Sequence, residues 1–404
     1  MKKIGFIFPG QGSQCKGMSN EWYKDTPIGQ DILKRASAIL GYDLSKICFY
    51  GDEDKIKTTE ISQPLIYVVD YILYKLIEER YHILPSVMAG HSLGEYTALA
   101  CSEVISFEDG LKLVSARSKI MNIVCESCDS GMLAVQNVNI SDLMSILAQH
   151  PMIDISCDND DNQIVVAGLK NDIDSLKEIF DENGIKYVVL KTAGAFHSRI
   201  FKEVASLFQK EIAQFKFHMP KNKLISNYSA KEISDLSEIG DNLTKQLYNT
   251  VRWRESVFEI EKQADYIIEI ATKKTLVNTV HKVPCYFYLD GIKMLEKISG
   301  YQVFPEEEIL RFAIRECVCT KSHCDAINNH KMKELYEKLL NEIKQITSIN
   351  RKNQDVYLEG IAQKVNEIYE LKGLSKHEIE IRKFFAAKEQ LSTRNFSILE
   401  SCLK

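Results

Sequence analysis

The chain has 404 residues, a formal net charge of −5 and 45% hydrophobic residues, which is the composition of a folded protein with material for two or three domains. The net negative charge gives no sign of the basic surface with which proteins bind nucleic acid. No segment approaches the roughly 20 consecutive apolar residues of a membrane span. The 11 cysteines are scattered and odd in number, which fits reduced thiols better than a disulfide framework. We therefore expect a cytoplasmic protein that binds neither nucleic acid nor membrane.

The first part of the chain alternates short apolar runs with long helical patterns. Ile4–Phe8 is typical of a short buried strand, and the glycine-rich Pro9–Gln14 predicts a loop behind it. A helical pattern covers Ile61–Arg80, and a second one begins at Ser106, a suitable N-cap, and runs towards Val124. Strands that alternate with helices predict a mainly parallel sheet covered by helices.

The segment Gly90–Gly94 reads Gly-His-Ser-Leu-Gly and lies between the apolar run Leu84–Ala89 and a helical pattern over Leu93–Ala100. Strand, G-x-S-x-G and helix together are typical of a nucleophile elbow, a stronger signal than the pentapeptide alone. Only glycines fit around so sharp a turn, and the free N–H groups of the helix favour a developing negative charge. A serine that caps an ordinary helix is the alternative. The preceding strand favours Ser92 as a nucleophile.

The pattern changes between Gly131 and Lys191, where short strands and two helices follow one another. The expected strands are Met132–Val135, Ile153–Cys157, Gln163–Ala167 and Lys186–Leu190, and the expected helices are Ile140–Ala148 and Asn171–Asn183. The polar stretch Asp158–Asn162 predicts the turn between the two middle strands. The order β-α-β-β-α-β is that of a ferredoxin-like unit, so we expect a small subdomain inserted into a larger α/β domain.

The rest of the chain returns to α/β character and then becomes helical. Helical stretches follow His197 and surround Gln246, and Tyr266–Ile270 predicts a strand. After about Tyr301 only charged helical patterns remain: Pro305–Glu316, Lys331–Ile346, Val356–Leu371 and His377–Glu389. One helix face there is apolar and needs burial: Leu335, Leu339, Ile343 and Ile346.

The C-terminal region also holds a cluster of cysteines with one histidine: Cys317, Cys319, His323 and Cys324. These residues are too crowded for the usual paired spacing of zinc ligands. We expect no metal site.

A serine nucleophile needs a base, and His197 is the histidine in the most unusual setting. It lies in the small-residue loop Gly194–Ser198, between the last strand of the subdomain and a helix. His91 adjoins the serine, with a side chain expected to point away from the reactive oxygen. A satisfied surface or core role fits the histidines in ordinary surroundings better: His82, His150, His218, His281, His330 and His377. Periodicity alone leaves the assignment of His197 as the base open.

Several separated motifs now occur in a recognisable order: Phe8–Gln14, Gly90–Tyr96, Ala116–Met121, Gly194–Ser198 and Gln246–Asn249. With them the chain resembles the malonyl-CoA:acyl carrier protein transacylases of fatty acid and polyketide synthesis, over about residues 1–295. The resemblance implies an α/β-hydrolase-like large domain (1–128 and 196–300), a ferredoxin-like small subdomain (129–195) and a C-terminal helical extension (301–404). The active site is then expected in the cleft between the first two.

The same resemblance implies a role for each matching residue. Ser92 is the nucleophile, His197 the base, and the backbone carbonyl of Gln246 orients His197 in place of the usual triad carboxylate. The backbone N–H groups of Gln11 and Leu93 form the oxyanion hole. An acyl-serine forms from malonyl-CoA and passes to the phosphopantetheine thiol of a carrier protein, without a cofactor.

Arg117 decides the substrate class in this family. A bare arginine on a helix is in most proteins solvated, but this position matches the arginine that grips the free carboxylate of malonate. Met121, Phe196 and His91 complete the acyl-binding residues that the resemblance implies. Phe196 is expected to leave little room for an α-methyl group, which favours malonyl over methylmalonyl.

Three alternatives remain open. An acyl-carrier-protein hydrolase of the same family typically lacks the arginine, a docking protein without catalysis has no need of an assembled nucleophile, and a general esterase does not explain the carrier-protein motifs. The helical extension resembles, less closely, that of discrete acyltransferases of trans-acyltransferase synthases. It either packs on the catalytic domain or docks polyketide synthase modules.

Overall fold

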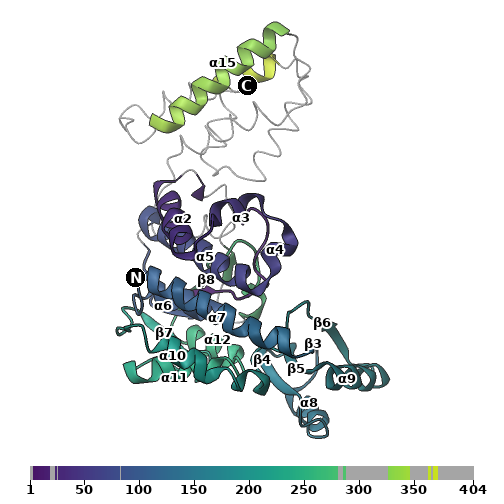
Figure 1. Ribbon diagram of the computed structural model, residues 1–404. Coiled ribbons are helices and arrows are strands. Elements are labelled where there is room, and N and C mark those ends of the chain that lie inside the picture. Colours follow the sequence, from purple (N-terminus) through teal and green to yellow (C-terminus); the bar gives the residue numbers. More distant parts are fainter. Residues whose placement is uncertain are drawn as a thin grey trace. The chain divides into compact units, whose positions relative to one another are not determined.

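The computed structural model describes residues 3–18, 23–24, 26–81, 83–280, 285–287, 326–345, 363–364 and 367–371. The chain separates into two compact units, residues 1–299 and 300–404. In Figure 1 the described elements of the first unit are coloured from purple to green along the chain, and α15 of the second unit is light green.

The first unit is built on a parallel sheet in which β1 (Ile4–Phe8) is central. The strand order is β7-β2-β1-β8-β9, with β2 at Val87–Gly90, β7 at Lys223–Ile225, β8 at Tyr266–Glu269 and β9 at Cys285–Phe287. Every residue of β1 and β2 is buried, as expected for strands covered on both faces. All these strands run the same way, so the loops that follow β1, β2, β7 and β8 meet at one edge of the sheet.

Helices cover this sheet, and two of them pack closely against each other. These are α5 (Thr59–Tyr81) and α7 (Phe107–Ser127), where Tyr67 donates a hydrogen bond to the Phe107 carbonyl at 3.0 Å. The side chain of Ser106 caps α7, as the sequence predicts. The other described α-helices of the first unit, outside the antiparallel subdomain, are α2 (Pro27–Leu40), α3 (Leu44–Tyr50), α4 (Glu53–Lys57), α6 (Leu93–Cys101), α10 (Ala205–Ile212), α11 (Leu236–Gln246) and α12 (Trp253–Glu261).

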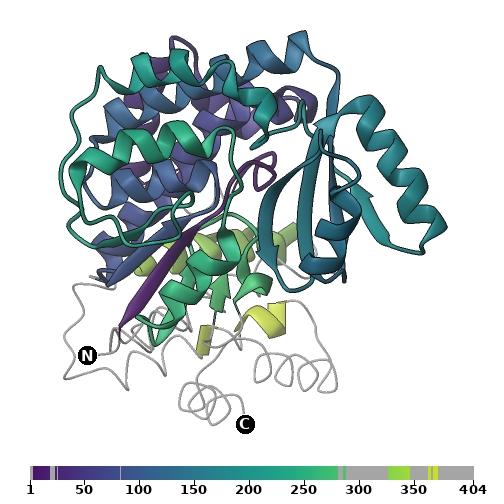
Figure 2. The same ribbon diagram turned by 90° about the horizontal axis from the view of Figure 1, so that it is seen from below.

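A separate antiparallel sheet stands beside these helices (Figures 1 and 2). Its strand order is β4-β5-β3-β6, the pairings are all antiparallel, and its core is its own, with buried residues such as Val166 and Phe180. The elements are β3 (Ser130–Gln136), α8 (Ile140–Leu147), β4 (Asp154–Asp160), β5 (Gln163–Leu169), α9 (Lys170–Glu182) and β6 (Lys186–Val189). The predicted order of this subdomain and the α/β fold class are confirmed, while the domain boundaries stay predictions.

The predicted turn at Asp158–Asn162 is wrong for its first three residues. β4 continues to Asp160, and only residues 161–162 form the turn. The Asp158 N–H donates to the Val251 carbonyl at 3.0 Å, and its carboxylate pairs with Arg254 at 2.7 Å. These tertiary partners stabilise extended backbone where local composition favours a turn.

The second unit contains α15 (Ala326–Gln345), which lies where a helix over 331–346 is predicted. Met332, Leu335 and Leu339 of α15 are buried, in agreement with the expected apolar face. Residues 363–364 and 367–371 are helical too. Outside the described residues lie Ile346, the side chain of Ile343, the predicted helices 305–316 and 377–389, and the cysteines at 317–324.

Within these described ranges, no helix combines the length and the apolar character that crossing a membrane requires.

Candidate active site

Ser92 lies on a sharp turn between β2 and α6. Its backbone angles are φ 53° and ψ −106°, a costly conformation for a residue with a side chain. A Cβ on Gly90 would lie 1.8 Å from the carbonyl carbon of Gly94, and a Cβ on Gly94 would lie 2.1 Å from the carbonyl oxygen of Phe8. Glycine alone fits at both positions, so the turn has the strand–elbow–helix geometry that the sequence predicts.

The loop after β1 runs against this turn. The N–H of His91 donates to the Phe8 carbonyl at 2.9 Å, and a Cβ on Gly10 would lie 2.7 Å from the His91 carbonyl oxygen. Gln11 comes next, and Leu93 is the first residue of α6, so its N–H has no acceptor within the helix. The two N–H groups predicted for an oxyanion hole therefore belong to segments that meet at the serine.

His197 contacts the serine and is held from its other side. Its Nε2 lies 2.7 Å from Ser92 Oγ, and its Nδ1 lies 2.7 Å from the backbone carbonyl oxygen of Gln246. A carbonyl oxygen can only accept, so Nδ1 carries the ring proton and Nε2 is left to accept the proton of the serine. The structure brings these three predicted residues into one hydrogen-bonded chain.

Burial keeps the imidazole of His197 uncharged. The residue is 4% exposed, and burial, followed by the positive charge of Arg117, lowers the pKa of His197 to about 3. At neutral pH the ring is therefore free to take a proton.

Arg117 of α7 is fully buried beside the serine. Its Nη2 donates to Ser92 Oγ at 3.1 Å and to Gln246 Oε1 at 3.2 Å, and its Nη1 donates to Gln63 Oε1 at 2.7 Å. The guanidinium also lies 5.2 Å from the centre of the Tyr96 ring. Among the described residues the hydrogen-bond partners of this guanidinium are all uncharged, and its Nε has no hydrogen-bond partner. A buried cation paired only with neutral groups is well suited to an incoming anion.

The side chain of Gln246 connects the serine, the arginine and a buried carboxyl group. Its Nε2 donates to the Ser92 carbonyl at 3.0 Å and to Glu95 Oε2 at 2.6 Å, while its Oε1 accepts from Arg117. Burial raises the pKa of Glu95 to about 7, although the hydrogen bond from Gln246 opposes that shift. The prediction for Gln246 concerned its backbone carbonyl alone.

Asn227 holds the elbow from the neighbouring strand. Its Oδ1 accepts the Ser92 N–H at 2.6 Å, its Nδ2 donates to the Gly90 carbonyl, and its own N–H donates to Glu95 Oε1 at 3.2 Å. Asn227 comes two residues after β7, which pairs with β2, so sheet topology brings it to the serine.

Three residues of this network are missing from the sequence predictions: Gln63, Glu95 and Asn227. Glu95 and Gln63 fall within helical patterns, where a polar residue normally faces solvent. Asn227 follows a short apolar run in the sequence. A polar residue at the carboxyl end of an expected strand is the signal by which it could have been identified as a site residue.

The other predicted residues lie around this centre. Met121 is buried, and its Sδ lies 3.5 Å from Gln63 Nε2, which also lies 3.5 Å from Gln11 Oε1. The Phe196 ring packs against Phe201, with ring centres 5.6 Å apart. Gln63 thus contacts Met121, Gln11 and Arg117.

His91 turns towards the small subdomain instead of the reactive oxygen. Its Nε2 lies 2.8 Å from Asn159 Oδ1, and its ring meets Trp253 edge to face at 5.5 Å. The expectation that this side chain points away from the serine oxygen agrees with these contacts.

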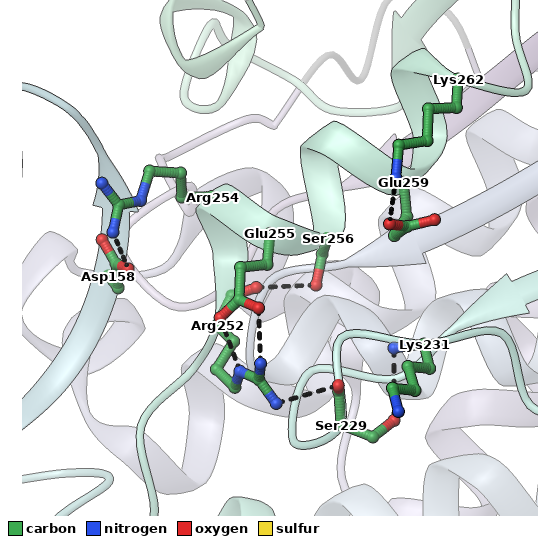
Figure 3. Close-up of polar contacts among 9 residues, drawn as sticks. All are labelled: Asp158, Ser229, Lys231, Arg252, Arg254, Glu255, Ser256, Glu259 and Lys262. Carbon is green, nitrogen blue, oxygen red and sulfur yellow. Dashed lines mark hydrogen bonds and ion pairs between the residues drawn. The ribbon is translucent and has the colours of Figure 1, made fainter.

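The small subdomain is attached to the segment that follows Gln246. Thr250 Oγ1 donates to the Ile155 carbonyl at 2.6 Å, and Figure 3 shows Arg254 of α12 reaching Asp158 of β4. Ser156 Oγ of the same strand donates to the Phe196 carbonyl at 2.8 Å. β4 thus links the segment that orients His197 to the loop that carries it.

Comparison with known proteins leads to the same family as the sequence motifs. The family model of the acyl transferase domain matches residues 5–285. The chain belongs to the acyl transferase family. The family predicted from the motifs is confirmed, and the enzyme class is that of an acyltransferase.

Two curated relatives and one solved structure illustrate how far the likeness of this acyltransferase extends. It is 35% identical over 282 residues to the polyketide biosynthesis protein ThaF of Burkholderia thailandensis, a match that covers 69% of this chain and 24% of ThaF. It is 32% identical over 307 residues to the malonyl CoA-acyl carrier protein transacylase of Staphylococcus aureus strain MRSA252, covering 74% of this chain and 99% of that protein. The chain thus spans about a quarter of ThaF but nearly all of the second relative.

The solved structure is that of a malonyl-transacylase in complex with its type II polyketide synthase acyl-carrier protein. It shares 27% identity and a TM-score of 0.69, covering 74% of this chain and 99% of that chain. The α/β fold therefore agrees with that of solved family members.

Proposed function

We propose that this acyltransferase moves a malonyl group from malonyl-CoA to the phosphopantetheine thiol of an acyl carrier protein, through an acyl-serine intermediate. The observation that carries the proposal is the buried guanidinium of Arg117, 3.1 Å from the Oγ of a serine that is itself 2.7 Å from a neutral histidine. The relatives described as malonyl CoA-acyl carrier protein transacylases support it.

In the first step Ser92 Oγ attacks the thioester carbonyl while His197 Nε2 takes its proton. The oxyanion that forms is stabilised by the N–H groups of Gln11 and Leu93. The tetrahedral intermediate collapses, His197 returns the proton to the CoA sulfur, and malonyl-serine remains. In the second step the carrier-protein thiol attacks this ester, gives its proton to His197, and the serine is regenerated.

Arg117 selects the acyl group. An anion that enters a partly desolvated pocket without a partner costs several kcal/mol, and the guanidinium offsets that cost. Met121, Phe196 and His91 remain the other proposed acyl-binding residues. Water is the competing acceptor, and a serine ester discharged to water would make the protein a hydrolase.

The setting of the reaction is part of the proposal. The family likeness supports a cytoplasmic enzyme of fatty acid or polyketide biosynthesis that acts on a carrier protein, without cofactor or metal. Residues 301–404 would then contact polyketide synthase modules or pack on the catalytic domain.

Intact-protein mass spectrometry tests this function. The chain is incubated with malonyl-, methylmalonyl- and acetyl-CoA, and the loaded protein is then mixed with holo carrier protein or buffer. We expect a malonyl adduct that transfers to the carrier. Ser92→Ala should form no adduct, whereas Ser145→Ala, a change at an exposed serine of α8, should load normally.

His197→Ala should slow loading by a factor on the order of 10³. An adduct on the Ser92→Ala protein would show that the nucleophile is another residue. Loss of the adduct to buffer as fast as to carrier protein would establish a hydrolase.

A further inference from the structure

The carboxyl group of Glu95 touches the site through two donors that come from distant parts of the chain. Oε2 accepts from Gln246 Nε2 at 2.6 Å, and Oε1 accepts from the Asn227 N–H at 3.2 Å. Glu95 is 1% exposed, so water does not compete for these oxygens.

Gln246 and Asn227 each hold different residues of the site in place. Gln246 accepts from the imidazole with its backbone carbonyl and from Arg117 with its side-chain oxygen. Asn227 binds the N–H of Ser92 and so supports its strained backbone. The buried carboxyl group of Glu95 therefore contacts both residues that hold Ser92, His197 and Arg117 in place.

The pattern of hydrogen bonds requires two acceptors at Glu95. A carboxylate offers acceptors on both oxygens. A protonated carboxyl adds an O–H donor that needs an acceptor of its own, and an amide replaces one of the two oxygens with an NH₂ donor. Whichever way an amide at this position turned, its NH₂ group would face either the Gln246 NH₂ or the Asn227 N–H. The ionised side chain accepts from both neighbours and needs no further acceptor.

The charge balance agrees with the hydrogen bonds. The Gln246 amide lies between the guanidinium of Arg117 on its oxygen side and Glu95 on its nitrogen side, so a neutral bridge separates cation and anion. The titratable groups that act on this carboxyl are Arg117 from α7 and Tyr96 from α6 itself. From α11 it meets the side-chain amide of Gln246, and from the loop after β7 it meets the backbone N–H of Asn227 and the hydroxyl of Ser226, none of which titrates near neutral pH.

We propose that Glu95, in its ionised form, is a positioning residue of the acyl transfer, which locks the Gln246 amide and Asn227 so that Ser92, His197 and Arg117 keep their working geometry. The inference rests on the proposed function, since it concerns the same site.

The test compares Glu95→Gln, Glu95→Asp and, as a matched control, Glu103→Gln, which changes an exposed glutamate shortly after the same helix. Rates of serine loading are measured with malonyl-CoA and acetyl-CoA between pH 5.5 and 9. We expect Glu95→Gln to load about 10- to 100-fold more slowly, because a hydrogen bond to a charged group is lost and a donor faces a donor. Glu103→Gln should match the wild type.

The Asp variant separates positioning from space filling. Aspartate keeps charge and both acceptors but is shorter, whereas glutamine keeps the size and loses an acceptor. A positioning role gives rates in the order wild type, Asp, Gln, and a packing role gives the reverse order of the two variants. A faster Gln than Asp variant would overturn the proposal.

The pH profile gives a second readout. The pKa of Glu95 is raised to about 7 and that of His197 is lowered to about 3, so an inflection near neutrality belongs to Glu95. Loading should rise through this inflection in the wild type and lack it in Glu95→Gln. An unchanged inflection in that variant would count against the role.

A double-mutant cycle checks that Glu95 acts through the Gln246 side chain. Gln246→Ala removes the amide and keeps the backbone carbonyl that holds His197, so the effect of Glu95→Gln should shrink in this background. An undiminished effect would overturn the route through Gln246. If the wild type forms no malonyl-serine, the proposed function fails, and if it does while all Glu95 variants load normally, this inference alone fails.

Discussion

At the scale of single residues, the site combines a buried cation with neutral partners. Arg117 reaches Ser92 Oγ, Gln63 Oε1 and Gln246 Oε1, all uncharged acceptors that a malonyl carboxylate could replace. The same contacts mean that the arginine supports the serine even when the acyl group has no charge.

Arg117→Ala should therefore damage loading of both acyl groups, but malonyl much more. We expect kcat/KM for malonyl-CoA to fall at least about 100-fold further than that for acetyl-CoA, because a charge-assisted bidentate contact is lost only with malonyl. Competition between the two CoA esters, on wild type and variant, measures the ratio. The matched control is Lys119→Ala, an exposed position on the same helix. An equal loss for both esters would assign Arg117 a structural role and reopen the hydrolase interpretation.

At the scale of elements, the elbow is fixed by close contact between β1, β2 and α6. Gly94, the second residue of α6, lies so close to the end of β1 that any side chain at this position would collide with the Phe8 carbonyl oxygen. The neighbouring backbone cannot move aside without disturbing the central strand of the sheet.

Gly94→Ala should accordingly destabilise the protein by about 1–3 kcal/mol or more, as overpacking does in a rigid core. It should also abolish serine loading, since the turn must shift. Gly131→Ala is the control, because a Cβ there would meet only Ile173 Cγ2 at 3.8 Å, an ordinary contact. Urea denaturation and the loading assay measure both effects. A Gly94→Ala protein as stable and active as Gly131→Ala would show that the elbow is less rigid than this geometry requires.

At the scale of the whole molecule, ionisation of buried Glu95, which the further inference requires, lowers the free energy of unfolding. Burial raises the pKa of Glu95 from 4.5 to about 7, so the ionised form that satisfies its hydrogen bonds is the form that burial disfavours. Between these two values the folded state binds more protons than the unfolded state. The contribution of Glu95 to the free energy of unfolding is thus present below pH 4.5 and is lost as the pH rises through about 7.

We predict that the wild type loses up to about 3 kcal/mol of unfolding free energy relative to Glu95→Gln between pH 4.5 and pH 7.5. His197 acts in the opposite direction, because its pKa is lowered to about 3 and its contribution is lost as the pH falls below 6.5. That contribution is common to both proteins and cancels in the difference. Urea denaturation of the two proteins at several pH values gives the difference, and a constant gap would contradict the prediction.

The sequence by itself determined the framework and the candidate catalytic residues. The glycines around Ser92, the apolar runs of β1 and β2 and the alternation of short strands with helices are local signals, since backbone sterics and hydrophobic periodicity act over a few residues. The same signals gave the order of the small subdomain. The motifs gave the family, including the positions of His197 and Arg117.

Only the tertiary structure decided what supports those groups. Asn227 reaches Ser92 because β7 pairs with β2, and Gln63 reaches Arg117 because α5 packs on α7. Glu95 follows Ser92 on α6, but its partners Gln246 and Asn227 come from distant parts of the chain. No local pattern encodes these contacts. The same holds for Asp158, which continues a strand because Val251 and Arg254 bind it. A polar side chain carries the same local signal on a solvated surface and in a buried network, and its partners, far away in the sequence, make the difference.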